Sequence, residues 1–151
     1  MTDHTEYRVT ALRDGTVIDH LPPGLALKAL EFLGHEGGNI VTVGMYLDSR
    51  KYGKKDLIKL ENKELTAGEI AKIAILGPHT TLAIIRDYRV VAKVEVNLGK
   101  EVAGVATCPN PNCITNHDDL RTRFHVMKRL PLTVCCHYCE RVITEDELEV
   151  R

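Results

Sequence analysis

Cys108-Pro-Asn-Pro-Asn-Cys113 and Cys136-His-Tyr-Cys139 are two cysteine pairs with 22 residues between them. Each pair has the spacing of a tight turn, which points two thiolates and several backbone N–H groups toward one place. Two such turns separated by enough chain for a hairpin are typical of a four-cysteine zinc ribbon. We therefore predict one structural zinc ion per chain, held by Cys108, Cys113, Cys136 and Cys139.

The predicted metal site is closed. A catalytic zinc ion keeps one coordination position for water, whereas four cysteines fill the tetrahedron. The ion is therefore expected to contribute to folding, on the order of 10–16 kcal/mol in small modules. Cys135 would form a poorer C-x3-C turn and is expected to pack as a small apolar residue. His117 and His137 are alternative ligands, but we expect both to be solvated.

The chain around the cysteines differs from the part before it. Its apolar runs are short, such as residues 124–126, and Pro, Gly and Asn separate them, so that a metal must replace a large core. A polar, glycine-containing stretch at 97–100 marks the boundary. We predict an N-terminal domain over 1–98 and a small all-β zinc-ribbon domain over 99–151.

The N-terminal part has the pattern β, α, β, β, α, β, with the final strand split or paired as a hairpin. This order predicts an α+β, ferredoxin-like βαββαβ sandwich with both helices on one face, which leaves the other face of the sheet to be covered or used. Thr66, with Glu69 three residues later, is a predicted capping box, and Gly34 is a predicted helix stop. The expected strands are 6–12, 39–47, 56–60, 82–85 and 88–96, and the expected helices are 25–33 and 66–76.

Composition excludes several classes of protein. The chain has 20 basic and 21 acidic residues, and from Lys100 onward 7 and 8, so neither part has the positive charge that nucleic-acid binding needs. No apolar run reaches the roughly 18 residues of a membrane helix, and the N-terminus lacks a signal-peptide pattern. We therefore expect a cytoplasmic protein without nucleic-acid or membrane partners, in which cysteines bind metal rather than form disulfides.

Charged residues on the predicted strands allow two interpretations. Lys55 and Lys59 are four residues apart on one strand, so they share a face at roughly 13 Å separation. With Asp19, His20 and Lys93 they are either ordinary solvated charges or a cup for a triphosphate and its ribose. The sequence has no glycine-rich phosphate loop, so phosphates would be held by side chains. The residues alone leave both interpretations open.

Several motifs in both domains resemble the regulatory chain of aspartate carbamoyltransferase. The resemblance runs from about residue 7 to about residue 143 and includes both cysteine motifs, 108–114 and 136–140. In the N-terminal domain it is carried by Gly15-Thr-Val-Ile-Asp-His20, Gly53-Lys-Lys-Asp-Leu-Ile-Lys-Leu-Glu-Asn62 and Tyr88-Arg-Val-Val-Ala-Lys93.

The resemblance implies one allosteric site that binds CTP as inhibitor and ATP as activator. Asp19 corresponds to the family's ribose contact and Lys59 to the lysine near ribose and base. His20 and Lys93 correspond to phosphate contacts, and Lys55 to a lysine near the phosphate end that can also serve a second nucleotide. Backbone groups that hold the base would come from around Ala11, Leu12, Ile85 and Tyr88.

The resemblance also implies a non-catalytic subunit of an enzyme of pyrimidine biosynthesis. The zinc domain would contact the catalytic chain through Asn110, Asn112, His117 and Glu140. Regulatory chains would pair through the strand at 39–47, in an assembly of six catalytic and six regulatory chains. This role fits a sequence without a nucleophile–base pair or paired carboxylates.

Three other classes remain as alternatives. A zinc-ribbon transcription or RNA-processing factor would need a basic stripe, which the charge count does not provide. An amino-acid-sensing βαββαβ domain would need a dimer-interface site lined by glycines and acids. A zinc enzyme would need one of the four cysteines to lie outside the metal shell.

Overall fold

A computed structural model describes residues 11–34, 37–51, 53–129 and 131–150. Its N-terminal part is an antiparallel sheet of five strands in the order β2-β3-β1-β4-β5. The strands are β1 (Gly15–Leu21), β2 (Val41–Ser49), β3 (Gly53–Glu61), β4 (Thr81–Arg86) and β5 (Arg89–Glu95).

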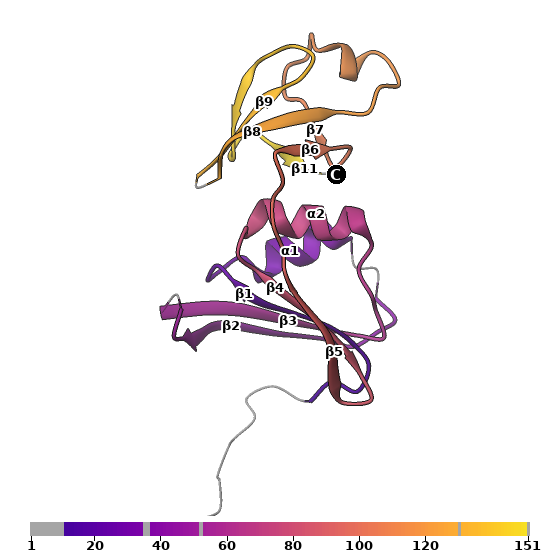
Figure 1. Cartoon of the computed structure of the whole chain (residues 1–151). Coiled ribbons are helices and arrows are strands. Elements are labelled where there is room, and N and C mark those ends of the chain that lie inside the picture. Colours follow the sequence, from indigo (N-terminus) through magenta and orange to yellow (C-terminus); the bar gives the residue numbers. More distant parts are fainter. Residues whose placement is uncertain (1–10, 35–36, 52, 130, 151) are drawn as a thin grey trace, which may run out of the picture.

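Helices α1 (Ala26–Leu33) and α2 (Ala67–Leu76) both cover the same face of this sheet (Figure 1). Each helix connects two strands that have a third strand between them, which is the ferredoxin-like arrangement, and β5 extends the sheet as a hairpin with β4. The predicted α+β class is confirmed. Within the described ranges, neither helix is long and apolar enough to cross a bilayer.

The expected strand at 6–12 is described only at its last two residues. Ala11 and Leu12 lie outside any strand, and residues 6–10 lie outside the described residues. Among the described residues, the first strand of the sheet is β1, which begins at Gly15. A Cβ at Gly15 would lie 2.1 Å from the carbonyl oxygen of Leu60, so this glycine permits close strand approach.

Helix α2 has both the start that the sequence predicts and an unusual end. Thr66 accepts a hydrogen bond from the Glu69 amide while the Glu69 carboxylate accepts one from the Thr66 amide, which confirms the capping box. The last four residues of the helix, Ile73–Leu76, are all buried. A helix end that is apolar all round is enclosed on all sides. Here the sheet lies on one side and the C-terminal module on the other (Figure 1).

The C-terminal module is all-β. Four strands form a sheet in the order β10-β9-β8-β6, and β7 pairs with β11. Phe124, Val134 and Ile143 have no exposed surface and form its small core. The elements are β6 (Glu101–Ala103), β7 (Ala106–Thr107), the 3₁₀ turn η1 (Ile114–Asn116), β8 (Arg123–Arg129), β9 (Leu132–Cys136), β10 (Val142–Thr144) and β11 (Glu149–Val150).

The predicted linker at 97–100 is held by contacts with the C-terminal module. Leu98 is buried, and the Asn97 side chain accepts a hydrogen bond from Arg129 at 3.0 Å. The Lys100 carbonyl accepts one from the amide of Val126 in β8. One hydrophobic cluster contains buried residues of both sheets. The two parts therefore pack against each other and are not joined by a flexible linker alone.

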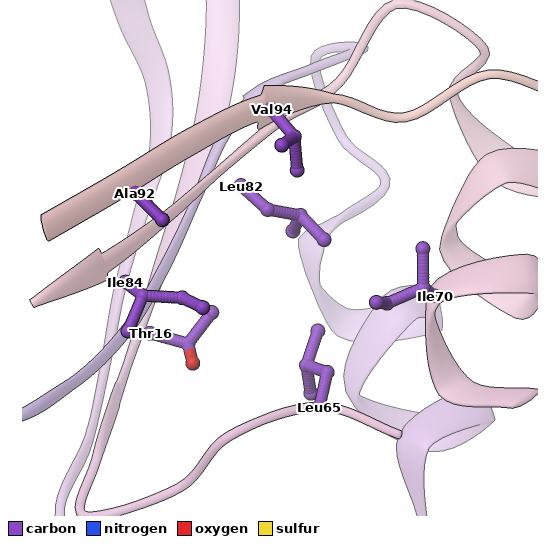
Figure 2. Close-up of a pocket in the computed structure, with 7 residues that line it drawn as sticks. All are labelled: Thr16, Leu65, Ile70, Leu82, Ile84, Ala92 and Val94. Atoms are coloured by element: carbon purple, nitrogen blue, oxygen red, sulfur yellow. The ribbon is translucent and has the colours of Figure 1, made fainter. Parts of the chain in front are cut away.

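A small apolar cavity of about 70 Å³ lies where α2 meets the β4–β5 hairpin (Figure 2). Ile70 and Leu65 approach it from the helix side, and Ala92 and Val94 from β5. Every residue of β5, which is an edge strand of the sheet, is exposed. Thr16, Leu82 and Ile84 complete the lining.

Candidate metal centre and candidate ligand face

The four cysteines of the two motifs converge in the C-terminal module. Cys108 follows β7, Cys113 precedes η1, and Cys136 and Cys139 flank the turn after β9. Their sulfur atoms all lie within 4.8 Å of one another. The two turns, which have 22 residues between them, are brought together because β8 and β9 form a hairpin there.

The geometry of the sulfur atoms fits a tetrahedral zinc ion. With Zn–S bonds of about 2.3 Å, neighbouring sulfurs of a tetrahedron lie about 3.8 Å apart. The observed separations are 3.7 Å for Cys108 and Cys139 and 3.8 Å for Cys113 and Cys136. Four soft thiolate donors select zinc over hard cations and leave no position for substrate water. These residues would hold a structural zinc ion.

Backbone hydrogen bonds shape the two turns. The Cys113 amide donates to the Asn110 carbonyl, and the Glu140 amide donates to the Cys136 carbonyl. Glu140 has φ +61°, a left-handed conformation that costs a residue with a Cβ about 1–3 kcal/mol. The side chain of Asn116 donates to the carbonyls of Cys108 and Asn110 and braces the longer turn. The metal turns are therefore built by local chain geometry as well as by the ligands.

The thiols differ in acidity. Burial raises the pKa of Cys108 to about 12 and also raises the pKa of Cys136. At Cys139 burial again disfavours the thiolate, but hydrogen bonds from the Arg141 backbone and the Asn110 side chain outweigh it and lower the pKa to about 7. Protons compete with metal for the thiols whose pKa is raised, so metal affinity falls as the pH falls.

The other candidate ligands lie outside the cluster. Cys135 is half-buried, and its sulfur lies 3.5 Å from the Glu140 carbonyl oxygen. A His117 ring nitrogen lies 2.8 Å from the Pro111 carbonyl oxygen, and a His137 ring nitrogen lies 2.9 Å from His125. Among the described residues, the group that could hold a metal contains four cysteines and no histidine.

The residues assigned to a partner contact surround the metal turns. Asn112 lies at the tip of the longer turn, His117 follows η1 and Glu140 follows the shorter turn, all with exposed side chains. Asn110 is half-buried, and its side-chain oxygen accepts the Asn112 amide. These four residues therefore lie on the two loops that the cysteines hold together.

The sheet of the N-terminal part presents its helix-free face to solvent. Lys59 pairs with Val17, Val17 with Ala83 and Ala83 with Lys93, so one row crosses β3, β1, β4 and β5. Paired residues of antiparallel strands share a face. Lys59 and Lys93 therefore stand at the two ends of a short apolar floor, about 14 Å apart from strand spacing alone.

A polar cluster lies beside this row. The Lys55 ammonium group lies 2.7 Å from a carboxylate oxygen of Asp19, which also accepts the His20 amide at 2.7 Å. A ring nitrogen of His20 lies 2.8 Å from the Thr81 hydroxyl. Burial lowers the pKa of Lys59, and the negative charge of Asp19 partly offsets this effect. The structure thus brings residues from three strands into one charged patch.

Three residues assigned to the base surround a separate cavity of about 160 Å³, namely Ala11, Leu12 and Lys59. Ile85 instead lines a groove with Arg86 and Asp14, and the Tyr88 amide donates to the Arg13 carbonyl at 2.9 Å. No motif in the sequence indicates the other residues of the cavity wall, because only β2–β3 pairing brings them together. They are Ile40, Thr42 and Glu61.

Comparisons with known proteins agree with both parts of this description. Residues 7–97 match the family model of the aspartate carbamoyltransferase regulatory chain, allosteric domain, and residues 100–149 match its metal-binding domain. The chain is 45% identical over 146 residues to the aspartate carbamoyltransferase regulatory chain of Pyrococcus abyssi, covering 95% of this chain and 96% of that protein. The values for the Methanothermobacter thermautotrophicus protein of the same name are 46%, 95% and 94%.

These matches cover both the sheet domain and the four-cysteine module, and the relatives are named as regulatory chains. The chain is accordingly a regulatory, non-catalytic subunit with an allosteric domain and a metal-binding domain. The residues of the second domain fit a structural zinc ion. This protein belongs to the family of aspartate carbamoyltransferase regulatory chains.

Proposed function

We propose that this chain binds nucleoside triphosphates, CTP as inhibitor and ATP as activator, and transmits their effect to catalytic chains of aspartate carbamoyltransferase. One observation carries the proposal. Cationic side chains at Lys55, Lys59 and Lys93 stand on one open face of the sheet, around an apolar floor. Ammonium groups on separate strands suit a ligand with several phosphates better than a single small anion.

The proposed roles follow from chemistry and position. His20 and Lys93 contact the phosphates, and Lys55 lies at the phosphate end, where it also serves a second nucleotide. Asp19 accepts hydrogen bonds from the ribose hydroxyls, for which it must exchange part of its contact with Lys55. Lys59 lies near ribose and base.

The base is proposed to enter the cavity beside Ala11 and Leu12, where backbone groups recognise it. Tyr88 and Ile85 approach from the neighbouring turn and strand. The side chains of Thr42 and Glu61 extend this wall with a hydroxyl group and a carboxylate group. Backbone recognition of a base requires a fixed chain, and the hydrogen bond between Tyr88 and Arg13 fixes two of these segments to each other.

The zinc module is proposed to contact the catalytic chain through Asn110, Asn112, His117 and Glu140. Structural zinc suits such a contact because it gives two short loops a single shape before they meet a partner. The edge strand β2 is proposed to pair with a second regulatory chain, in an assembly of six catalytic and six regulatory chains. We place this assembly in the cytoplasm, where thiols remain reduced.

Allosteric control requires two sites and two global states that ligands prefer unequally. Nucleotide binding is proposed to shift the sheet against α2, whose buried end lies against the zinc module. The fastened segment at 97–100 follows this shift. A coupling of about 1–3 kcal/mol is typical and sufficient to move a quaternary equilibrium.

The test uses purified catalytic chain with and without this chain while CTP and ATP are titrated. We expect CTP to raise and ATP to lower the aspartate concentration at half-saturation, only when this chain is present. Unchanged substrate saturation, with co-elution of the two chains, would reduce the protein to a scaffold. Absence of co-elution would contradict the partner as well.

A further inference from the structure

Asp56 is a buried acidic residue directly beneath the charged patch. It lies in β3 between Lys55 and Leu57, and its side chain points to the opposite face from Lys55, toward the helices. Its exposed fraction is 0%. Burying a carboxylate is costly unless hydrogen bonds compensate it. The hydrogen bonds of the Asp56 carboxylate therefore decide what this buried side chain does.

Both carboxylate oxygens accept hydrogen bonds from backbone amides of other elements. One oxygen accepts the amide of Ala26, the first residue of α1, at 2.9 Å. The other accepts the amide of Tyr46 in β2 at 3.0 Å. One side chain of β3 therefore holds both the start of a helix and the edge strand of the sheet.

The contact with Tyr46 lies at an irregularity of the sheet. Between Gly44 and Leu47 the pairing of β2 with β3 shifts by one residue, and Tyr46 has φ +56°. A second shift occurs on the other side of β3, between Ile18 and Leu21 of β1. His20 in that segment has φ +59°.

The two bulges thus flank the same short segment of β3, residues 55–58. A bulge re-aims side chains and increases local twist, and conformations with positive φ persist only when their surroundings hold them. Asp56 supplies such a restraint directly at Tyr46. The bulge in β1 contains two of the proposed effector ligands, Asp19 and His20.

We propose that Asp56 is a positioning residue that couples the helix-free face of the sheet, where the nucleotide is proposed to bind, to the edge strand β2 and to helix α1. It touches no nucleotide, because it lies on the other face of the sheet. A displacement of Lys55 by a bound triphosphate moves the adjacent Asp56, and with it the amides of Tyr46 and Ala26. This inference rests on the proposed function. It adds the residue through which nucleotide binding on the helix-free face affects β2 and α1.

The experiment measures amide hydrogen exchange in the complex with the catalytic chain, with and without CTP. In the unaltered complex, we expect CTP to slow exchange both near the ligand, in β1 and β3, and remotely, in β2 and α1. Asp56→Asn keeps the size of the side chain, but its amide group meets a backbone amide donor to donor. We expect this variant to keep the slowing in β1 and β3, to bind CTP within about threefold of the unaltered affinity, and to lose the remote slowing and most of the shift in half-saturation.

Glu31→Gln is the matched control, because it removes an exposed carboxylate of α1, the helix that Asp56 contacts, at a residue outside every proposed binding surface. It should leave all four readouts unchanged. If Asp56→Asn does not fold, the double variant with Tyr46→Gly takes its place, since glycine adopts φ +56° without strain. Persistence of the remote slowing in the Asp56 variant would overturn the inference while leaving the proposed function intact. Absence of any CTP effect in the unaltered complex would overturn both.

Discussion

The zinc module and the five-stranded sheet domain bring their functional residues together in opposite ways. In the module, two turns carry all four metal ligands, and the spacing within each turn is visible in the sequence. In the sheet domain, most candidate ligand residues are spread over four strands, and strand register makes them neighbours. A site made by turns is therefore predictable from spacing, whereas a site made by pairing needs the fold.

The stability of the two regions should differ most when metal is removed. Chelation is expected to unfold residues beyond about 100, because zinc supplies on the order of 10 kcal/mol to a module with few buried apolar residues. The sheet domain has its own core and should keep its helices, although the buried end of α2 becomes exposed. Hydrogen exchange of the metal-free chain measures both regions at once.

Single cysteine substitutions sharpen this prediction. Cys113→Ser should abolish stoichiometric zinc binding, whereas Cys135→Ser should leave it unchanged, because the Cys135 sulfur lies outside the cluster. Metal content by atomic absorption is the readout. Equal loss of zinc in both variants would show that the ligand set is wrong.

CTP binding on the helix-free face of the sheet should weaken when a single charge is removed, while the fold is kept. Lys59→Met keeps the aliphatic stem and removes the ammonium group, and we expect it to weaken CTP binding about tenfold or more, the scale of one charge-assisted hydrogen bond. Lys54→Met removes a neighbouring lysine that pairs with Asp48 in solvent. Calorimetry with CTP should separate the two variants. Similar CTP affinities of the two variants would contradict the proposed role of Lys59.

Two buried threonines allow a direct comparison of the regions. The Thr80 hydroxyl of the sheet domain is buried without a hydrogen-bond partner among the described residues, whereas the Thr122 hydroxyl of the module donates to the Ala106 carbonyl at 2.6 Å. We expect Thr80→Val to raise the free energy of unfolding by about 1 kcal/mol and Thr122→Val to lower it by a similar amount. Urea denaturation of the zinc-loaded chain, followed by circular dichroism, measures both. If the free energy of unfolding changed in the same direction in both variants, this account of the two hydroxyl groups would be wrong.

The smallest expected effect concerns pH. Burial disfavours the Glu69 carboxylate, but hydrogen bonds from Thr66 and Lys63 and the charge of Lys63 outweigh burial and lower its pKa below 4.5. A lowered folded-state pKa adds stability above the unfolded value, and this stability is lost as the pH falls through the folded value. Glu69→Gln should remove this part of the acid dependence while keeping a capping side chain. The measurement is the free energy of unfolding as a function of pH. The same dependence at acid pH in the variant and in the unaltered chain would contradict this prediction.

The sequence predicted the fold class, the capping box of α2 and the stop of α1 at Gly34, because each depends on neighbouring residues. It missed β1, in which Gly15 permits the close approach of β3. It also missed Thr42 and Glu61, which border the cavity only through β2–β3 pairing. Asp56 was unremarked because its partners are backbone amides, which no side-chain motif reveals.

A crystal structure of this chain grown with CTP would test the central claim most directly. The account predicts a nucleotide on the helix-free face of the sheet, with phosphates near His20 and Lys93, the ribose near Asp19, and the cysteine cluster occupied separately by one metal ion. A nucleotide bound at the zinc module, or an empty sheet face at saturating CTP, would contradict it.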